Sequence, residues 1–345
     1  MASERSVQDS TADGGRTASL LSIVVPLFNE APVLGRFYDR LREVLDRLAV
    51  PAEIWLVDDG SRDDTAAIAG ALADQDPRVG VISFSRNFGH QMALTAGLDH
   101  AQGDVVVCLD GDGQHPPALI PEMLALYQQG YDIVLTRRRS HGETWLKRLT
   151  SVGFYKLINA LSGTAIEPGA ADFRLMSGRA ARALSSAREF HRFLRGMVQW
   201  IGFRSTMIDF DPAPRLAGET KYTFRKMLRL ALHATVSFST VPLRLSILLG
   251  LILVALAAVE AGHAVYLVLS GQHDRLVPGW TSLMLAVLGI GGVQLIMLGV
   301  IGQYIGMIFE QVKGRPLYIV RDLMAPKRTA LDRAEGGQMA AADRP

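Results

Sequence analysis

Two carboxylates one residue apart, Asp110 and Asp112, follow an apolar run in the stretch VVVCLDGDGQHPP, residues 105–117. Hard divalent cations such as Mg²⁺ or Mn²⁺ prefer carboxylate oxygens and bridge to the phosphates of a substrate. Gly111 between them lets the backbone approach a ligand closely. Surface turns also use Asp and Gly, so this short sequence alone is weak evidence. Its position at the end of a strand-like run favours a cation site.

A second acidic pair, Asp58 and Asp59, ends another apolar run. A carboxylate at a strand end can accept hydrogen bonds from a ribose or a base. Helix capping is the alternative, but Asp63 and Asp64 lie closer to the next helical pattern and suit that role better. Two further apolar runs also end in polar residues, which are Asn29 and Glu30, and then Arg86, Asn87 and His90. For this last group a structural loop is an equal alternative.

Strand-like and helix-like patterns alternate from residue 21 onward. The expected strands are 21–28, 52–59, 79–85, 104–110 and 132–136, and the expected helices are 31–48, 63–74, 89–101 and one after Pro117. Repeated strand–helix units predict an α/β fold with a mostly parallel sheet and helices on both faces. Ligands of such sheets bind beyond the carboxyl ends of the strands. We therefore expect the polar strand ends to meet at one rim.

Composition limits the class of protein. The net charge of +2 gives no reason to expect nucleic acid as a partner. A single cysteine, Cys108, excludes a disulfide framework and fits a reducing compartment. Residues 1–20 are polar, lack the apolar core of a signal peptide, and are expected to be a disordered tail.

Two long apolar segments, 244–270 and 280–309, predict transmembrane helices, since either could cross a hydrocarbon core of about 30 Å. A pair of buried core helices is the alternative. Both outer flanks are rich in Lys and Arg, whereas the connecting loop has only Arg275. The positive-inside rule then places the domain 21–222 and the C-terminal tail 310–345 in the cytoplasm.

Residues 223–243 predict an amphipathic helix at the membrane interface, with a helix packed on the soluble domain as the alternative. Within the spans, Glu260, His263 and Gln294 are polar groups that need partners, and Gly302 and Gly306 permit close helix approach. Packing within the hairpin or a homo-oligomer, a dimer or tetramer, would use these features equally well.

The quoted motifs, together with SIVVPLFNE, VDDGSRDDT, ADFRLMS, RLAGETKY and GRPLYIV, resemble the polyprenyl-phosphate glycosyltransferases of glycosyltransferase family 2 over about residues 21–322. The similarity is greatest to the bacterial undecaprenyl-phosphate glucosyltransferase type with a C-terminal membrane hairpin. The resemblance implies a GT-A fold, Mg²⁺ or Mn²⁺, and inverting transfer of one sugar from a nucleotide-diphosphate sugar to polyprenyl phosphate. A UDP-sugar, the lipid bilayer and the inner membrane of a bacterium are the implied donor, partner and location.

The resemblance also implies roles for individual residues. The metal ligands would be Asp110, Asp112 and Gln114, and Asp112 would thereby act in catalysis. Nucleotide-sugar binding would involve Pro26, Asn29, Glu30, Asp58, Asp59, Arg86 and Asp110. Asp172 would be a catalytic carboxylate or a sugar anchor. The acceptor phosphate would meet Arg137, Lys147, Ser151, Arg174, Arg215 and Lys221.

Some alternatives stay open from the sequence. The choice among Arg137, Arg138 and Arg139 is not fixed, and a solvated basic patch near anionic lipid is the plain alternative for this run. A processive polysaccharide synthase would need more spans than two to build a polymer channel. A non-catalytic membrane adaptor would not need the acidic motifs, all of which are present.

Overall fold

The computed structural model describes residues 16–138, 170–190, 192–211 and 279–327, with a few separate positions between 248 and 270. Several predictions fall outside these residues. They concern most of the N-terminal tail, Arg139, Lys147, Ser151, Arg215, Lys221, the helix 223–243, most of the first apolar segment, Glu260 and His263.

The described strands form one eight-stranded sheet in the order β7-β5-β6-β4-β1-β2-β3-β8. Their bounds are β1 Leu21–Leu27, β2 Ala52–Asp58, β3 Val79–Phe84, β4 Val105–Cys108, β5 Ile133–Arg138, β6 Ala170–Ser177, β7 Ser205–Phe210 and β8 Val320–Met324. Strand β1 pairs in parallel with β2 and β4, β2 with β3, and β5 with β7, whereas β6 and β8 run antiparallel to their neighbours. The expected α/β fold with a mostly parallel sheet is therefore confirmed.

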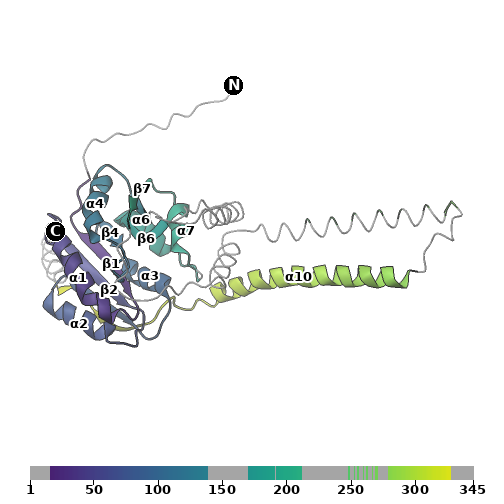
Figure 1. Ribbon diagram of the computed structural model, residues 1–345, viewed down its shortest axis with the longest axis horizontal. Coiled ribbons are helices and arrows are strands. Elements are labelled where there is room, and N and C mark those ends of the chain that lie inside the picture. The colour runs from purple at the N-terminus through teal and green to yellow at the C-terminus, as the bar shows by residue number, and fades with distance from the viewer. Residues whose placement is uncertain are drawn as a thin grey trace, which may run out of the picture.

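Helices cover both faces of this sheet, as Figure 1 shows. They are α1 Ala31–Leu45, α2 Thr65–Gln75, α3 His90–His100, α4 Ile120–Gln128, α6 Gly178–Ser186 and α7 Leu194–Trp200, with a short 3₁₀ turn at Pro117–Leu119. The two-residue period of β1 sends Ile23 and Val25 into the core under α1, α2 and α4, and Val24 into the core under α3, α6 and α7. Burial on both faces explains why the sequences of these strands are mostly apolar at successive positions instead of alternating between apolar and polar residues.

Both ends of the α/β domain extend beyond the predicted boundaries. Arg16 and Ser19, from the expected tail 1–20, bond to Asp132 and Asp104, so residues 16–20 are tied to the domain. At the other end, β8 lies in the expected tail 310–345 and pairs with β3 as an edge strand. The sequence also gave no signal for β6 and β7, which complete the sheet on the side of β5.

Helix α10, Trp280–Val312, extends away from the α/β domain (Figure 1). Within the described part of the chain, its segment Gly289–Val312 is the one stretch long and apolar enough to cross a membrane, with a mean hydropathy of 1.7 and no buried residues. The helix predicted over 280–309 is thus present. Its length and composition would allow it to cross a membrane, and the first predicted span lies mostly outside the described residues.

Candidate active site

The loops that follow β1 and β2 are tied together at the carboxyl rim of the sheet. Asn29 adopts a positive φ of 56°, which Asn tolerates better than most residues. Its backbone N–H donates to Ser61 Oγ at 3.0 Å, and its Oδ1 accepts from the backbone N–H of Arg62 at 2.9 Å. Glu30 donates its backbone N–H to Thr65 Oγ1 at 2.8 Å. Two of the predicted nucleotide-binding residues therefore help to build the rim itself.

The buried carboxylates Asp58 and Asp59 fix the neighbouring loops. Asp58 Oδ1 accepts from the Ser61 backbone N–H at 3.1 Å, while Asp58 Oδ2 is buried and has no hydrogen-bond partner among the described residues. Asp59 accepts from the backbone N–H groups of Phe88 and Gly89, at 2.6 and 2.9 Å. Burial raises the pKa of Asp59 despite these hydrogen bonds. Asp59 thereby holds the turn that starts α3 and presents His90.

Glycine is required in the turn that carries Asp110 and Asp112. A Cβ on Gly111 would lie 2.5 Å from Leu27 Cδ2, and Gly113 has a φ of 76°. Asp112 Oδ1 accepts from the Gln114 backbone N–H at 3.0 Å. Asp110 Oδ1 is buried and makes no hydrogen bond within the described residues.

The buried side chain of His115 supports the turn that carries Asp110 and Asp112. It is 2% exposed, and its ring lies 5.4 Å from that of Phe173 in a stacked arrangement. Its Nδ1 accepts from the Asp110 backbone N–H at 3.0 Å. Burial lowers the pKa of His115, so the ring is neutral near pH 7, as an accepting Nδ1 requires.

Asp172 meets Asp110 because of the strand register. Antiparallel β4 and β6 place Cys108 opposite Arg174, so two residues further on Asp110 is level with Asp172. The Asp172 side chain is 6% exposed and is held by two arginines. Arg174 Nη2 lies 2.5 Å from Oδ1, while Arg195 Nε and Nη2 lie 3.1 and 2.7 Å from Oδ1 and Oδ2.

His90 lies between the two carboxylates. Its Nε2 is 3.4 Å from Asp110 Oδ1 and 3.6 Å from Asp172 Oδ2. Burial acts to lower the pKa of His90, but contact with Asp172 and the charges of both carboxylates outweigh it, so the pKa is raised. Burial would raise the pKa of Asp172, yet His90, Arg174 and Arg195 hold it well below the ordinary value. The rim is thus a densely charged centre that keeps Asp172 ionised.

The arginines after β5 point to different partners. Arg137 lies opposite Asp209 in the parallel β5–β7 register, and its Nε and Nη2 donate to that carboxylate at 2.7 and 3.1 Å. Arg138, on the other face of the strand, donates from Nη2 to Gln114 Oε1 at 2.8 Å. Arg138 is therefore the arginine of this run that the described structure connects to the acidic turn.

The structure places the remaining candidates as follows. Asp110, Asp112, Gln114 and Asp172 come together at the rim. Arg174 is 2% exposed and its guanidinium faces Asp172, so its predicted phosphate contact has no open surface in this arrangement. Pro26 lies within β1, opposite Val57. Arg86 is exposed, with its guanidinium 4.1 Å from the centre of the Phe88 ring.

Two site residues were not found from the sequence. Arg195 is one of several arginines between residues 174 and 195, and Asp209 lies in a strand that was not expected. Only the tertiary structure pairs them with Asp172 and Arg137. Within the described residues, no group of three or more His, Cys, Asp and Glu side chains converges as a complete metal site.

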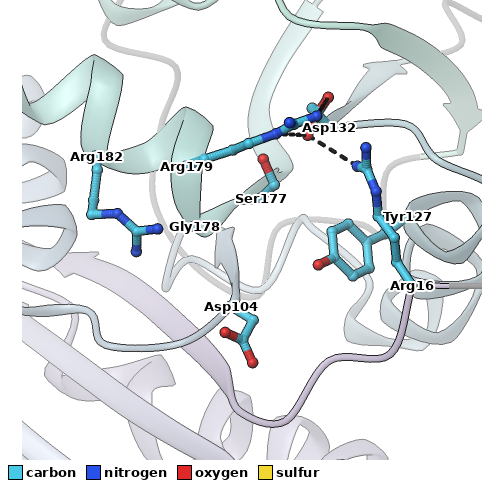
Figure 2. Close-up of a pocket in the computed structure, with 8 residues that line it drawn as sticks. All are labelled: Arg16, Asp104, Tyr127, Asp132, Ser177, Gly178, Arg179 and Arg182. Atoms are coloured by element: carbon cyan, nitrogen blue, oxygen red, sulfur yellow. Dashed lines mark hydrogen bonds and ion pairs between the residues drawn. The ribbon is translucent and has the colours of Figure 1, made fainter. Parts of the chain in front are cut away.

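A separate cavity of about 260 Å³ lies at the amino ends of the parallel strands, opposite the rim. Its lining includes Asp104 and Asp132, which precede β4 and β5, and Ser177, which ends antiparallel β6. Figure 2 shows Arg16 and Arg179 both reaching the buried Asp132. This cavity is therefore distinct from the strand-end site.

The mostly parallel sheet with acidic strand ends at one rim defines an α/β protein whose ligand site lies at that rim. Comparisons with known proteins give the family. Residues 22–184 match the model of Glycosyl transferase family 2. An uncharacterized glycosyltransferase of Synechocystis sp. is 43% identical, with 88% of this chain and 95% of that protein covered. The chain belongs to glycosyltransferase family 2, and it is a glycosyltransferase.

Two further similarities concern proteins with named ligands. The bactoprenol glucosyl transferase of Shigella phage SfII is 40% identical, with 87% of this chain and 97% of that protein covered. A glucosyl-3-phosphoglycerate synthase from Mycobacterium tuberculosis, solved with Mn²⁺ and UDP-glucose, is 20% identical with a TM-score of 0.46, covering 63% of this chain and 78% of that chain. A structural similarity this low says nothing about the ligands of the present chain.

Proposed function

We propose that this glycosyltransferase moves a single sugar from a nucleotide-diphosphate sugar, with UDP as the favoured nucleotide, to polyprenyl phosphate and inverts the anomeric configuration. The observation that carries the proposal is the meeting of Asp110, Asp112 and Asp172 at one rim, beside Asp58 at the end of β2. The relatives named bactoprenol glucosyl transferase, at about 40% identity over most of the chain, support the polyprenyl acceptor.

The donor set at the acidic turn fits a hard divalent cation, Mg²⁺ or Mn²⁺. Asp110 offers a buried oxygen that makes no hydrogen bond among the described residues and faces His90 Nε2 at 3.4 Å, and Asp112 offers a second carboxylate beyond Gly111. Gln114 would add its Oε1, an amide oxygen with two lone pairs, one of which here accepts from Arg138. When bound, such a cation supplies charge neutralisation for the leaving diphosphate.

The protein's own groups account for the other requirements. Asp58 and Asp59 would hold the nucleoside end of the donor, since they end β2 at the rim. His90, Arg174 and Arg195 keep Asp172 ionised and oriented beside the reacting centre. The acceptor arrives as an anion, and cations must offset its repulsion from the donor. We assign this role to Arg138 or Arg137 together with Lys147, Arg215 and Lys221, and Ser151 would add a hydroxyl hydrogen bond to the acceptor phosphate.

The membrane arrangement belongs to the same proposal. Helix α10 and the segment 244–270 would form a hairpin in the inner membrane of a bacterium, with the rim on the cytoplasmic side. A dimer or tetramer remains a prediction from Gly302 and Gly306, where an added Cβ would meet no atom of the described residues within 4 Å.

The test uses the full-length protein in vesicles that contain polyprenyl phosphate and a panel of labelled nucleotide sugars. We expect labelled glycolipid with one donor, loss of activity with EDTA, and a fall of at least about 10²-fold for Asp112→Asn. Asp39→Asn, an exposed carboxylate on α1, is the matched control and should keep wild-type activity. Absence of glycolipid with every donor would refute the acceptor assignment, and full activity in EDTA would refute the cation.

A further inference from the structure

The Gln311 side chain fastens the carboxyl end of α10 to the α/β domain. Gln311 Oε1 accepts from the backbone N–H of Phe190 at 2.7 Å, and Gln311 Nε2 donates to the backbone carbonyl of Arg188 at 2.8 Å. Both partners lie in the loop between α6 and α7. A pair of hydrogen bonds in opposite directions fixes the orientation of this loop relative to α10, which a single bond would not do.

A second attachment follows directly after α10. The Tyr318 hydroxyl donates to Asp99 Oδ2 at 2.7 Å, and the Tyr318 ring stacks on Phe84 with 5.1 Å between centroids. Asp99 also receives both terminal nitrogens of Arg188, at 2.7 and 2.9 Å, and the hydroxyl of Ser185. One carboxylate, 11% exposed, therefore joins α3, α6, the α6–α7 loop and the segment after α10.

Strand β8 completes this attachment. Gly314, with a φ of 59°, lies between the end of α10 and the segment that returns to the sheet. The backbone N–H of Ser85 donates to the Ile319 carbonyl, and β8 then pairs with β3 in the register Ile82 opposite Leu323. The carboxyl end of β3, which lies at the rim, is thus hydrogen-bonded to the segment that follows α10.

The attached elements are the ones that carry rim residues. The α6–α7 loop leads into α7, where Arg195 binds Asp172 and the backbone N–H of Leu194 donates to Gln91 Oε1 at 3.1 Å. Helix α3 has Asp99 near one end and His90 at the other. The attachments therefore connect α10 to the elements that build the rim, and a shift of α10 against the domain would change the position of the rim as a whole relative to α10.

We infer that Gln311, Tyr318 and Asp99 are positioning residues for sugar transfer, because they hold the rim at a fixed place relative to α10. The inference rests on the proposed function, in which the acceptor phosphate stays at the membrane surface while the donor arrives from water. Reaction between them requires a fixed distance from the rim to the bilayer. A displacement of about 1 Å can cost up to roughly 10²-fold in rate.

The experiment compares two acceptors with the full-length protein in vesicles. One acceptor is a long-chain polyprenyl phosphate in the bilayer, and the other is a short-chain, water-soluble prenyl phosphate. For Gln311→Ala and Tyr318→Phe we expect kcat with the bilayer acceptor to fall about tenfold. The rate with the soluble acceptor and the KM for the nucleotide sugar should stay within about twofold, since neither depends on the bilayer distance.

Matched controls come from the same helix and the same residue types. Gln303→Ala changes an exposed glutamine on α10, and Tyr131→Phe changes a tyrosine beside Arg204, at the edge of the sheet away from the rim. Both should behave as wild type. Hydrogen exchange gives a readout apart from activity, and Gln311→Ala should speed exchange in residues 187–195 while Gln303→Ala should not.

The possible outcomes separate the inference from the function. Equal losses with both acceptors would mean general damage and would overturn the positioning role, as would unchanged kinetics in an active protein. A wild-type protein that transfers sugar to neither acceptor would overturn the proposed function, and the inference with it.

Discussion

Replacement of Arg195 by Gln tests whether the charge arrangement around Asp172 serves transfer. The substitution removes the two hydrogen bonds of 3.1 and 2.7 Å and leaves Arg174 as the remaining arginine on Asp172. Breaking a fully buried ion pair costs roughly 3–5 kcal/mol. Because the Arg195 side chain is 39% exposed, solvent screens the pair, and we expect a loss of only about 1–2 kcal/mol in the free energy of unfolding.

A matched arginine–aspartate pair, Arg179 with Asp132, lies at the amino ends of the parallel strands, opposite the rim. Arg179 Nε and Nη2 lie 2.7 and 2.6 Å from the two oxygens of Asp132, whose side chain is 4% exposed, and Arg16 is the second arginine there (Figure 2). Arg179→Gln should therefore cost a similar stability without touching the rim. We expect transfer to fall about 10²-fold for Arg195→Gln and to stay within about twofold for Arg179→Gln.

Thermal unfolding of the detergent-solubilised protein and initial rates of transfer measure the two effects. At about 2–4 °C per kcal/mol, the melting temperatures of both variants should drop by a few degrees and by similar amounts. Equal activity losses in the two variants would show that the rate reports stability alone. Full activity in Arg195→Gln would show that the orientation of Asp172 does not matter to the reaction.

Two further predictions concern stability and the acidic turn. Burial would raise the pKa of Asp76, but Arg78 and Tyr38 lower it to about 2, so its stabilisation is present above pH 4 and is lost as the pH falls toward 2. Asp76→Asn should cost about 2 kcal/mol at pH 7, and chemical denaturation should show that difference shrinking between about pH 4 and 2; a constant difference would contradict the assignment. Gly111→Ala forces a Cβ against buried Leu27 and should cost about 1–3 kcal/mol and lower transfer at least about tenfold. Adding Leu27→Ala should recover part of the melting temperature, and no recovery would refute the steric explanation.

The strands that the sequence predicted are buried on both faces over most of their length. In β1, β2 and β4 every residue is buried, so each strand is a mostly apolar run followed by polar residues, with Ser22 and Glu53 as buried polar exceptions inside the runs. Parallel pairing of these strands then predicted that the polar residues after each strand lie at the same rim of the sheet. The acidic residues Asp58, Asp59, Asp110 and Asp112 could be placed together for that reason alone.

The strands that the sequence missed lie at the edges or run in the other direction. Residues 320–324 are mostly exposed and include Arg321 and Asp322, so no buried pattern marks β8. Its partner β3 lies more than two hundred residues earlier in the chain. Likewise, Arg195 pairs with Asp172 across a helix and a loop, and a basic stretch gives no sign of which arginine will face a carboxylate.

The direction of β6 explains the electrostatics of the site and narrows its chemistry. An antiparallel strand brings its amino end to the rim, so Asp172 faces the ligand side while Arg174, two residues on and on the same side of the strand, binds it from behind. With Arg195 and His90 added, the pKa of Asp172 stays well below its ordinary value.

An efficient general base has a pKa near the working pH, so Asp172 is poorly suited to remove a proton from a sugar hydroxyl. A phosphate acceptor is already ionised and needs no such base. An ionised Asp172 held by two arginines agrees with the proposed phosphate acceptor, and efficient transfer to a neutral polyprenol would contradict that proposal.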